Sequence, residues 1–226
     1  MKKIIALVAV AAISVSMVCA QIGLTVGAKG NFGMNAGTAV TESAKKFVKD
    51  GKNVFMVNGG GAVYARYNMP FHAPLGVQME IGIRANNGGG LKVDDYSMKM
   101  SYTTMDIPLL VTYDIPVSSL VITPMLGLNF GIPVGKGKWS TKTPFGEDSS
   151  KVEVTGLPKV KAGIVVGADV ALPLGPGSLT GGLSYIADFS EVAVVLPIEG
   201  APGYSQANEV LTRRNLNISV GYAIKL

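Results

Sequence analysis

Eight segments of the chain alternate between apolar and polar residues, which is the pattern of β-strands with two unlike faces. In the last segment, Leu216, Ile218 and Val220 fall on one face, whereas Asn217 and Ser219 fall on the other. Each segment is long enough for a tilted membrane strand, which needs about 9 to 11 residues. The predicted strands are residues 21–34, 54–67, 75–85, 102–113, 120–130, 160–172, 179–189 and 216–226. The alternation therefore predicts an all-β chain.

The connections between these strands alternate strictly between long and short. The long ones are residues 35–53, 86–101, 131–159 and 190–215, and the short ones are residues 68–74, 114–119 and 173–178. Short turns at one end and longer loops at the other are typical of outer-membrane barrels. The spacing predicts an eight-stranded antiparallel up-and-down transmembrane β-barrel formed by residues 21–226, with both termini on the periplasmic side.

Charged residues are confined to one face of the predicted strands. The apolar faces carry none, and the opposite faces carry nine: Lys29, Arg66, Glu80, Arg84, Asp106, Lys161, Asp169, Asp188 and Lys225. The interior of an eight-stranded barrel is just wide enough to be filled by side chains, and unpaired charges there are costly. We predict a network of ion pairs that closes the lumen. If the turn at residues 173–178 is tight, Lys161 and Asp188 face each other near the outer rim.

Composition agrees with a lipid-facing exterior. Only 15% of the residues are charged, against a usual share of roughly 25%, and 29 of 226 are glycine. No apolar run after Ala20 approaches the roughly 20 residues of a membrane-spanning helix, so a membrane crossing requires a closed barrel. The net charge of +5 falls to +3 once Lys2 and Lys3 are removed, which is too small to indicate nucleic-acid binding.

The N-terminus has the features of a secretory signal peptide. Lys2 and Lys3 precede an apolar run at residues 4–13, and Val18-Cys19-Ala20 fits a signal-peptidase site. We expect residues 1–20 to be removed, which leaves a cysteine-free chain. The alternative is a lipoprotein acylated at Cys19, although Val18 is a poor residue for that signal.

Alternation alone leaves open which face points inward. A soluble, lipocalin-like periplasmic barrel would bury the apolar face, but the polar face has many glycines and few lysines for a solvated exterior. Aromatic residues also gather near strand ends, as in the girdles at lipid interfaces. We therefore expect the apolar face to meet lipid. Pro108 and Pro124 lack a ladder donor, and we expect a bulge or fraying at each.

The end of the chain resembles the C-terminal signal by which outer-membrane barrels are recognised for insertion, and the residues that carry it are Gly221, Tyr222, Ile224 and Leu226. The segment at residues 105–113, with its Ile-Pro-Leu sequence, is similar to strands of PorT-like barrels. The whole mature chain resembles the small barrel families of the OmpA, OmpX, OmpW and PorT-like types. Such a resemblance implies a barrel and contact with the insertion machinery, but the families are functionally mixed.

Catalytic and metal-binding patterns are weak. His72 is the only histidine and lies in a short turn without a partner histidine or cysteine. Asp94 and Asp95 form an acidic pair that is more simply explained as solvated. The sequence therefore predicts no enzyme, no cofactor and no metal site.

Basic residues in two long loops, beside the only tryptophan, suit a polyanionic surface ligand such as lipopolysaccharide or a glycosaminoglycan. The candidates are Lys45, Lys46, Lys49, Lys136, Lys138 and Trp139. Ordinary solvated loops are the simpler explanation of the same residues. We predict an integral outer-membrane protein that is envelope-structural and binds or adheres through its loops. A narrow channel for small, apolar solutes is the alternative.

Overall fold

The computed structural model describes residues 23–39, 52–69, 74–93, 96–143, 146–153, 160–189, 192–195 and 208–226. The predicted signal peptide, Cys19, His72 and the acidic pair at residues 94–95 lie outside these ranges, as do Lys45, Lys46 and Lys49. Within them, no helix is long and apolar enough to cross a membrane.

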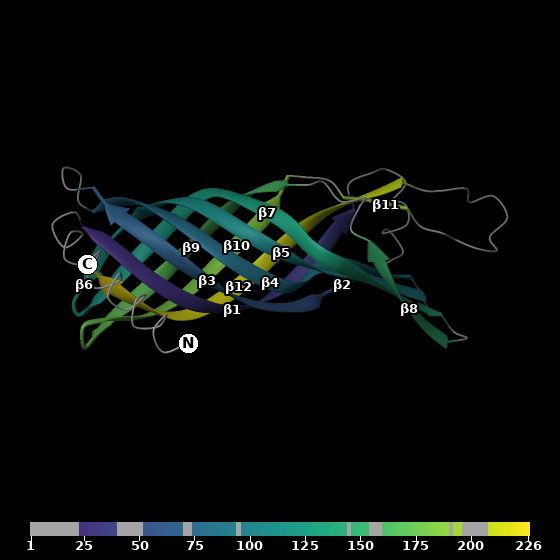
Figure 1. The fold of residues 1–226 in the computed structure, drawn as a ribbon, viewed down its shortest axis with the longest axis horizontal. Coiled ribbons are helices and arrows are strands. Elements are labelled where there is room, and N and C mark those ends of the chain that lie inside the picture. Colours follow the sequence, from purple (N-terminus) through teal and green to yellow (C-terminus); the bar gives the residue numbers. More distant parts are fainter. Residues whose placement is uncertain are drawn as a thin grey trace, which may run out of the picture.

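Eight long antiparallel strands form one closed barrel (Figure 1). They are β1 (Leu24–Ala39), β3 (Met56–Asn68), β4 (Leu75–Val93), β5 (Tyr96–Tyr113), β7 (Leu120–Thr143), β9 (Lys161–Leu174), β10 (Gly177–Asp188) and β12 (Asn208–Lys225). Each strand pairs with the next along the chain, and β1 pairs with β12 to close the ring. The predicted fold class is confirmed.

Four short strands extend the sheet beyond the barrel. β2 (Lys52–Val54), β8 (Gly146–Glu153) and β11 (Val192–Val195) lie at one end of the molecule, and β6 (Ile115–Val117) lies at the other end with the C-terminus (Figure 1). We call these the loop end and the turn end. At the turn end, Leu174 pairs with Gly177 around a two-residue turn in which Gly175 has a φ of +62°. Positive φ at this position favours glycine in such hairpins.

Two of the predicted long loops are largely strand, which corrects the expectation for residues 86–101 and 131–159. β4 continues to Val93 and β7 continues to Thr143, from which β8 returns. We call residues 87–93, 96–101, 136–143 and 146–153 the surface sheet. Register shifts between Arg84 and Asn87 and between Ser101 and Thr103 separate the surface sheet from the barrel wall. Beyond these bulges, serine and lysine replace the apolar residues of the outer face, so the sequence pattern imitates a solvated loop.

The prolines do not cause the predicted bulges. Pro108 is in register with Asn129, and Pro124 is in register with Ala168. The pairing of β4 with β5 is interrupted at Ile107 and Pro108, and the alignment is the same on either side of the interruption. The missing N–H of Pro108 thus interrupts one ladder without inserting an extra residue.

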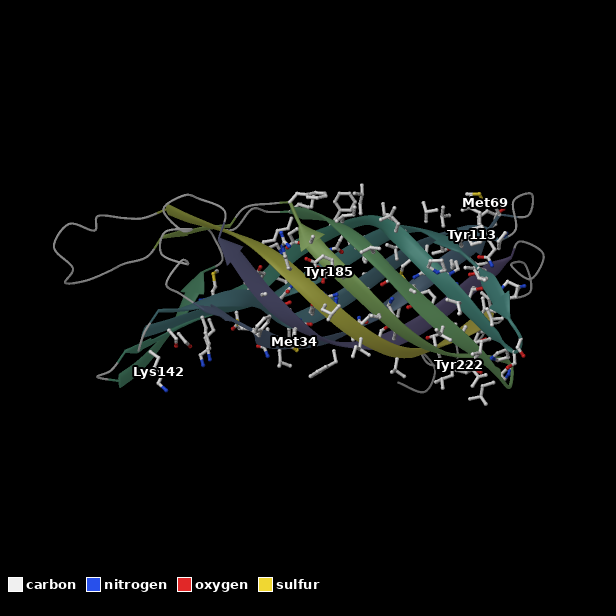
Figure 2. All side chains as sticks on the ribbon, turned by 180° about the vertical axis from the view of Figure 1, so that it is seen from behind. Met34, Met69, Tyr113, Lys142, Tyr185 and Tyr222 are labelled. Carbon is white, nitrogen blue, oxygen red and sulfur yellow. The ribbon has the colours of Figure 1, made fainter. Side chains whose placement is uncertain are left out.

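The barrel is polar inside and apolar outside. Ile83 is 60% exposed and Leu126 is 54% exposed on the outer wall, whereas Lys161 and Asn129 are fully buried inside. A soluble barrel would show the reverse, so the lipocalin-like alternative is wrong. Outward-facing aromatic residues Tyr113 and Tyr222 lie near the turn end, where a lipid interface is expected (Figure 2).

Candidate functional site

At the turn end of the lumen, Arg66 of β3 is the centre of a polar cluster. Its Nε donates to Gln78 Oε1 at 2.7 Å, and one terminal nitrogen donates to Asp114 Oδ1 at 3.2 Å and to Thr123 Oγ1 at 3.3 Å. The other terminal nitrogen lies 3.9 Å from Asp169 Oδ2. A guanidinium can engage several partners because it presents five N–H donors in a fixed plane. Arg66 therefore links β3, β4, β7 and β9 as well as the turn that follows β5.

Asp114 is a lumen residue that the sequence analysis assigned to a turn. Besides Arg66, it accepts hydrogen bonds from Asn68 at 3.0 Å and from Thr123 at 2.7 Å. Its position continues the inward alternation of β5 by one step beyond the buried Thr112. That alternation was the signal that could have identified it.

The middle of the lumen holds an ion pair between Lys29 of β1 and Glu80 of β4. Lys29 Nζ lies 2.7 Å from Glu80 Oε1, and Gln78 Nε2 donates to the same oxygen at 2.6 Å. The ammonium group also lies 5.6 Å from the centroid of the Tyr64 ring. That ring covers Gly27, where an added Cβ would be 2.5 Å from Tyr64 Cζ. The close packing leaves no room for a side chain at position 27.

A third group of charges lies nearer the loop end. Arg84 Nε is 3.3 Å from Asp106 Oδ2, and Lys161 donates a hydrogen bond to the hydroxyl of Tyr102. The Lys161 ammonium lies 4.3 Å from the centroid of the Tyr102 ring, within the range of a cation–π contact. Lys161 is fully buried, and its contacts with Tyr102 offset part of the free-energy cost of removing the ammonium group from water.

Lys161 and Asp188, which were predicted to face each other, are both buried on the inward face but are offset by two residues in register. Asp188 is buried and has Gly163 as its Cα partner, two residues from Lys161. The two-residue turn at Gly175 fixes this alignment, which places Asp188 beside a glycine. A Cβ added to Gly163 would lie 2.9 Å from Asp188 Oδ1, so the missing side chain leaves space for the carboxylate.

Asparagines line the loop end of the lumen, a feature that the sequence analysis missed. Asn58 Nδ2 donates to Asn35 Oδ1 at 2.9 Å and to Asn215 Oδ1 at 3.2 Å. Asn35 in turn donates to the carbonyl oxygen of Asn86 at 3.0 Å, at the bulge where Asn86 has a φ of +56°. The three amides join β1, β3 and β12 around the seam of the barrel. Because asparagine is uncharged, only the inward positions of these residues in the alternation could have identified them from the sequence.

One part of the lumen wall is apolar. Leu110, Met125, Val165 and Ile186 form a cluster of buried side chains from β5, β7, β9 and β10, each 2–4% exposed. They occupy inward positions of strands that the charge pattern marked as polar. The polar network and this cluster together fill the lumen with side chains.

Lys225, counted among the nine inward charges, is exposed at the turn end and is paired in register with Thr25. The predicted insertion signal occupies the same strand. Tyr222 donates from its hydroxyl to the Leu174 carbonyl oxygen at 2.8 Å, and Ile224 is 40% exposed on the outer wall. Gly221 is the Cα partner of Lys29, and the backbone N–H of Leu226 donates to the Leu24 carbonyl at 2.8 Å.

The surface sheet carries the remaining predicted binding residues. Lys136 and Lys138 are exposed on β7. The backbone of Trp139 is paired with Met100 on one side and with Ser150 on the other. These positions belong to regular strands rather than to loops, so their spacing is set by the sheet.

Residues 19–190 match the family of outer membrane protein beta-barrel domains. The chain belongs to this family. OprG from Pseudomonas aeruginosa has a similar structure, with a TM-score of 0.53 and 12% identity, over 91% of this chain and 96% of that one. Ail of Yersinia pestis aligns with a TM-score of 0.41 and 11% identity, over 90% of this chain and 99% of that one. Neisserial surface protein A aligns with a TM-score of 0.42 and 14% identity, over 90% of this chain and 97% of that one.

No curated protein sequence matches the chain. Family membership and the apolar outer wall together identify an integral β-barrel protein of the cell outer membrane. The family establishes the fold and the location, and the likeness to OprG supports the fold. The lumen and the surface sheet are the regions from which the function must be inferred.

Proposed function

We propose that the protein is a non-conducting, envelope-structural barrel that binds ligands through its loop end, which faces the cell exterior. The observation that carries the proposal is the filled lumen. Arg66 of β3 lies 3.9 Å from Asp169 of β9 on the opposite side of the ring, and Lys29 of β1 meets Glu80 of β4 at 2.7 Å over the intervening β3. An eight-stranded barrel has no further room for an aqueous path once such side chains span it.

A structural role also accounts for the lumen charges better than catalysis does. Lys29, Glu80, Arg84 and Asp106 have side chains no more than 10% exposed, so a substrate could not reach them without opening the network. The apolar cluster around Leu110 supports closure in the same way, because its side chains are packed against one another. We therefore propose neither an enzyme nor a solute channel.

Planar-bilayer recording tests the closed lumen directly. The wild-type protein should insert without steady ion conductance. The matched variant replaces Lys29, Glu80, Arg84 and Asp106 with alanine, which removes side chains that fill the lumen and should produce small, steady conductance steps. That variant also demonstrates that insertion can be detected. Steady conductance by the wild-type protein would overturn the proposal.

Binding is assigned to the loop end because exposed basic side chains are clustered there. Lys136, Lys138 and Lys142 lie on the surface sheet, and Lys45, Lys46 and Lys49 precede β2 in the chain. Clustered lysines attract polyanions. Removal of residues 136–151 should abolish binding of lipopolysaccharide and of heparin while the barrel remains folded. If binding survives both this deletion and replacement of Lys45, Lys46 and Lys49 by glutamine, binding at the loop end is wrong.

Two further parts of the account concern biogenesis. We infer that residues 1–20 are removed as a signal peptide, and that the segment ending at Leu226 is recognised by the barrel-insertion machinery. Mass spectrometry of the mature protein should find an N-terminus at Gln21, whereas an acylated N-terminus at Cys19 would support the lipoprotein alternative. Deletion of residues 224–226 should reduce the amount of protein in the outer membrane.

A further inference from the structure

Serine and lysine alternate on one face of the surface sheet, on both β5 and β7. Residues directly opposite each other in an antiparallel pair have side chains on the same face, and so do residues two apart along a strand. The opposed pairs are Ser97 with Lys142, Lys99 with Ser140, and Ser101 with Lys138. Lys99, Lys138 and Lys142 are therefore each opposite a serine, and the two residue types form a checkerboard; Lys136, two residues before Lys138, has Glu153 of β8 as its Cα partner.

Ser140 lies at the centre of three lysines. Lys138 and Lys142 are two residues before and after it on β7, and Lys99 is its Cα partner on β5. Opposed Cβ atoms are about 4.5–5.5 Å apart, and alternate residues along a strand are about 7 Å apart. All three lysines are exposed and Ser140 is half-buried. Three ammonium groups and one hydroxyl are thus within reach of a single tetrahedral anion.

The charge on this face is strongly unbalanced. On the other side of β7, Lys136 has Glu153 as its Cα partner, Lys138 has Lys151 and Lys142 has Glu147. These register positions, together with Lys99, give five lysines and two glutamates, a net charge of +3. Close like charges on a sheet are destabilising. An anion bound among them would relieve that repulsion, which gives the site a preference for multiply charged groups.

The lysine face continues the lipid-facing wall of the barrel. On β7 the outward positions are Leu126, Leu128 and Val134, which are 54%, 49% and 36% exposed. The β5–β7 register shifts by two residues at the bulge, from Thr103↔Val134 to Ser101↔Lys138. A shift of two preserves the face. The lysines therefore begin on the outer wall just where its apolar residues end, and Lys142 lies far from Tyr113 and Tyr222 (Figure 2).

We propose that Ser140, Lys99, Lys138 and Lys142 bind the phosphate groups of the anionic glycolipid in the outer leaflet around the barrel. This assignment rests on the proposed function and names the ligand of its surface sheet. Lipid is favoured over a soluble polyanion because the site is on the outer wall, directly above the surface that contacts acyl chains. A basic patch next to a membrane surface binds anionic headgroups, and charge-assisted hydrogen bonds to phosphate are the strongest available to these side chains.

The experiment uses the full-length protein in zwitterionic detergent, titrated with lipopolysaccharide and with the same lipopolysaccharide after chemical removal of its phosphates. Fluorescence of Trp139, the only tryptophan, reports binding because it lies between Lys138 and Ser140 in the chain. Native mass spectrometry counts the bound glycolipid independently. The variants are Lys99→Gln/Lys138→Gln/Lys142→Gln and Ser140→Ala. The control is Lys225→Gln, an exposed lysine at the turn end.

The wild-type protein should bind the phosphorylated glycolipid at least about tenfold more tightly than the dephosphorylated form, as expected when three exposed charge pairs are formed. The triple variant should lose this preference, Ser140→Ala should weaken it a few-fold, and Lys225→Gln should match the wild type. Equal affinity for both glycolipids, or wild-type binding by the triple variant, would overturn the assignment.

A parallel titration with heparin separates this inference from the proposed function. Suppose that the protein binds heparin more tightly than lipopolysaccharide and loses heparin binding in the variant that lacks Lys99, Lys138 and Lys142. That result would assign the checkerboard to soluble polyanions. The lipid assignment would then be wrong, although loop-end binding would stand. If removal of residues 136–151 and glutamine at Lys45, Lys46 and Lys49 left all polyanion binding intact, the proposed function itself would fail.

Discussion

The ammonium group of Lys29 lies 2.7 Å from Glu80 Oε1, and the pair joins two strands, β1 and β4, that are separated in the sheet by β3. The two side chains are 10% and 7% exposed. The connection passes over the lumen side of β3 instead of following the ladder. It therefore ties β1 to β4 inside the barrel and occupies space that a solute would need.

Breaking this pair from one side should be more harmful than removing it entirely. Glu80→Leu leaves the Lys29 charge buried without its carboxylate, and should lower the free energy of unfolding by about 3 to 5 kcal/mol. The double variant Lys29→Met/Glu80→Leu should be clearly less destabilised, because no unpaired charge remains. Urea unfolding in lipid vesicles measures both, with Lys225→Met as the control. Equal destabilisation by the single and double variants would contradict the account.

Two glycines on opposite faces provide a matched test of which side is crowded. A Cβ on Gly82, which faces the lumen, would lie 2.8 Å from the Cβ of Ala62 and 2.9 Å from the Gly61 carbonyl oxygen. A Cβ on the outward Gly181 has its nearest neighbour at 4.0 Å. Gly82→Ala should destabilise the barrel by about 1 to 3 kcal/mol through overpacking. Gly181→Ala should be neutral or slightly stabilising, and the opposite order would reverse the assignment of the two faces.

A charge on the outer wall should be costly only within the membrane. Ile81 is 46% exposed in the middle of β4, and Ile81→Arg should lower the free energy of unfolding in lipid by about 2 to 4 kcal/mol. Val117 in β6 has nearly the same exposure, 45%, but lies at the turn end. Val117→Arg should cost about 1 kcal/mol or less, as expected near an interface. Similar costs at both positions would mean that the wall does not contact hydrocarbon.

The barrel itself could be predicted from the sequence because its two faces differ so strongly. Ile81 and Ile83 meet lipid while Glu80 and Arg84 meet the lumen, and this contrast appears directly as alternation. The charged lumen residues were recognised for the same reason. Asn58 and Asn215 were not recognised as lumen residues, because a neutral amide can face either side and its direction is known only once the strand register is known.

The surface sheet was missed because the physical cause of alternation disappears outside the membrane. The outward positions of β7 change from Leu128 to Lys138, so apolar residues no longer mark the strand. Hydrogen bonding to β5 and β8 sustains the strand there, and neither partner is evident from local sequence. The two-residue offset between Asp188 and Lys161 was not predicted, because the register depends on a single turn at Gly175. Long-range pairing, rather than propensity, decides each of these features.

The orientation of the two faces is the central claim, and the accessibility of a single nitroxide label tests it most directly. Val63 is 59% exposed on the outer wall, and Cys19 is the only native cysteine, so Cys19→Ser/Val63→Cys carries one label. In phospholipid bilayers, this label should collide frequently with oxygen and rarely with a water-soluble nickel complex. A label at the exposed turn residue Ser119 should show the reverse. Frequent nickel collisions at Val63, or infrequent collisions with both reagents as in a dry protein core, would contradict a lipid-facing outer wall.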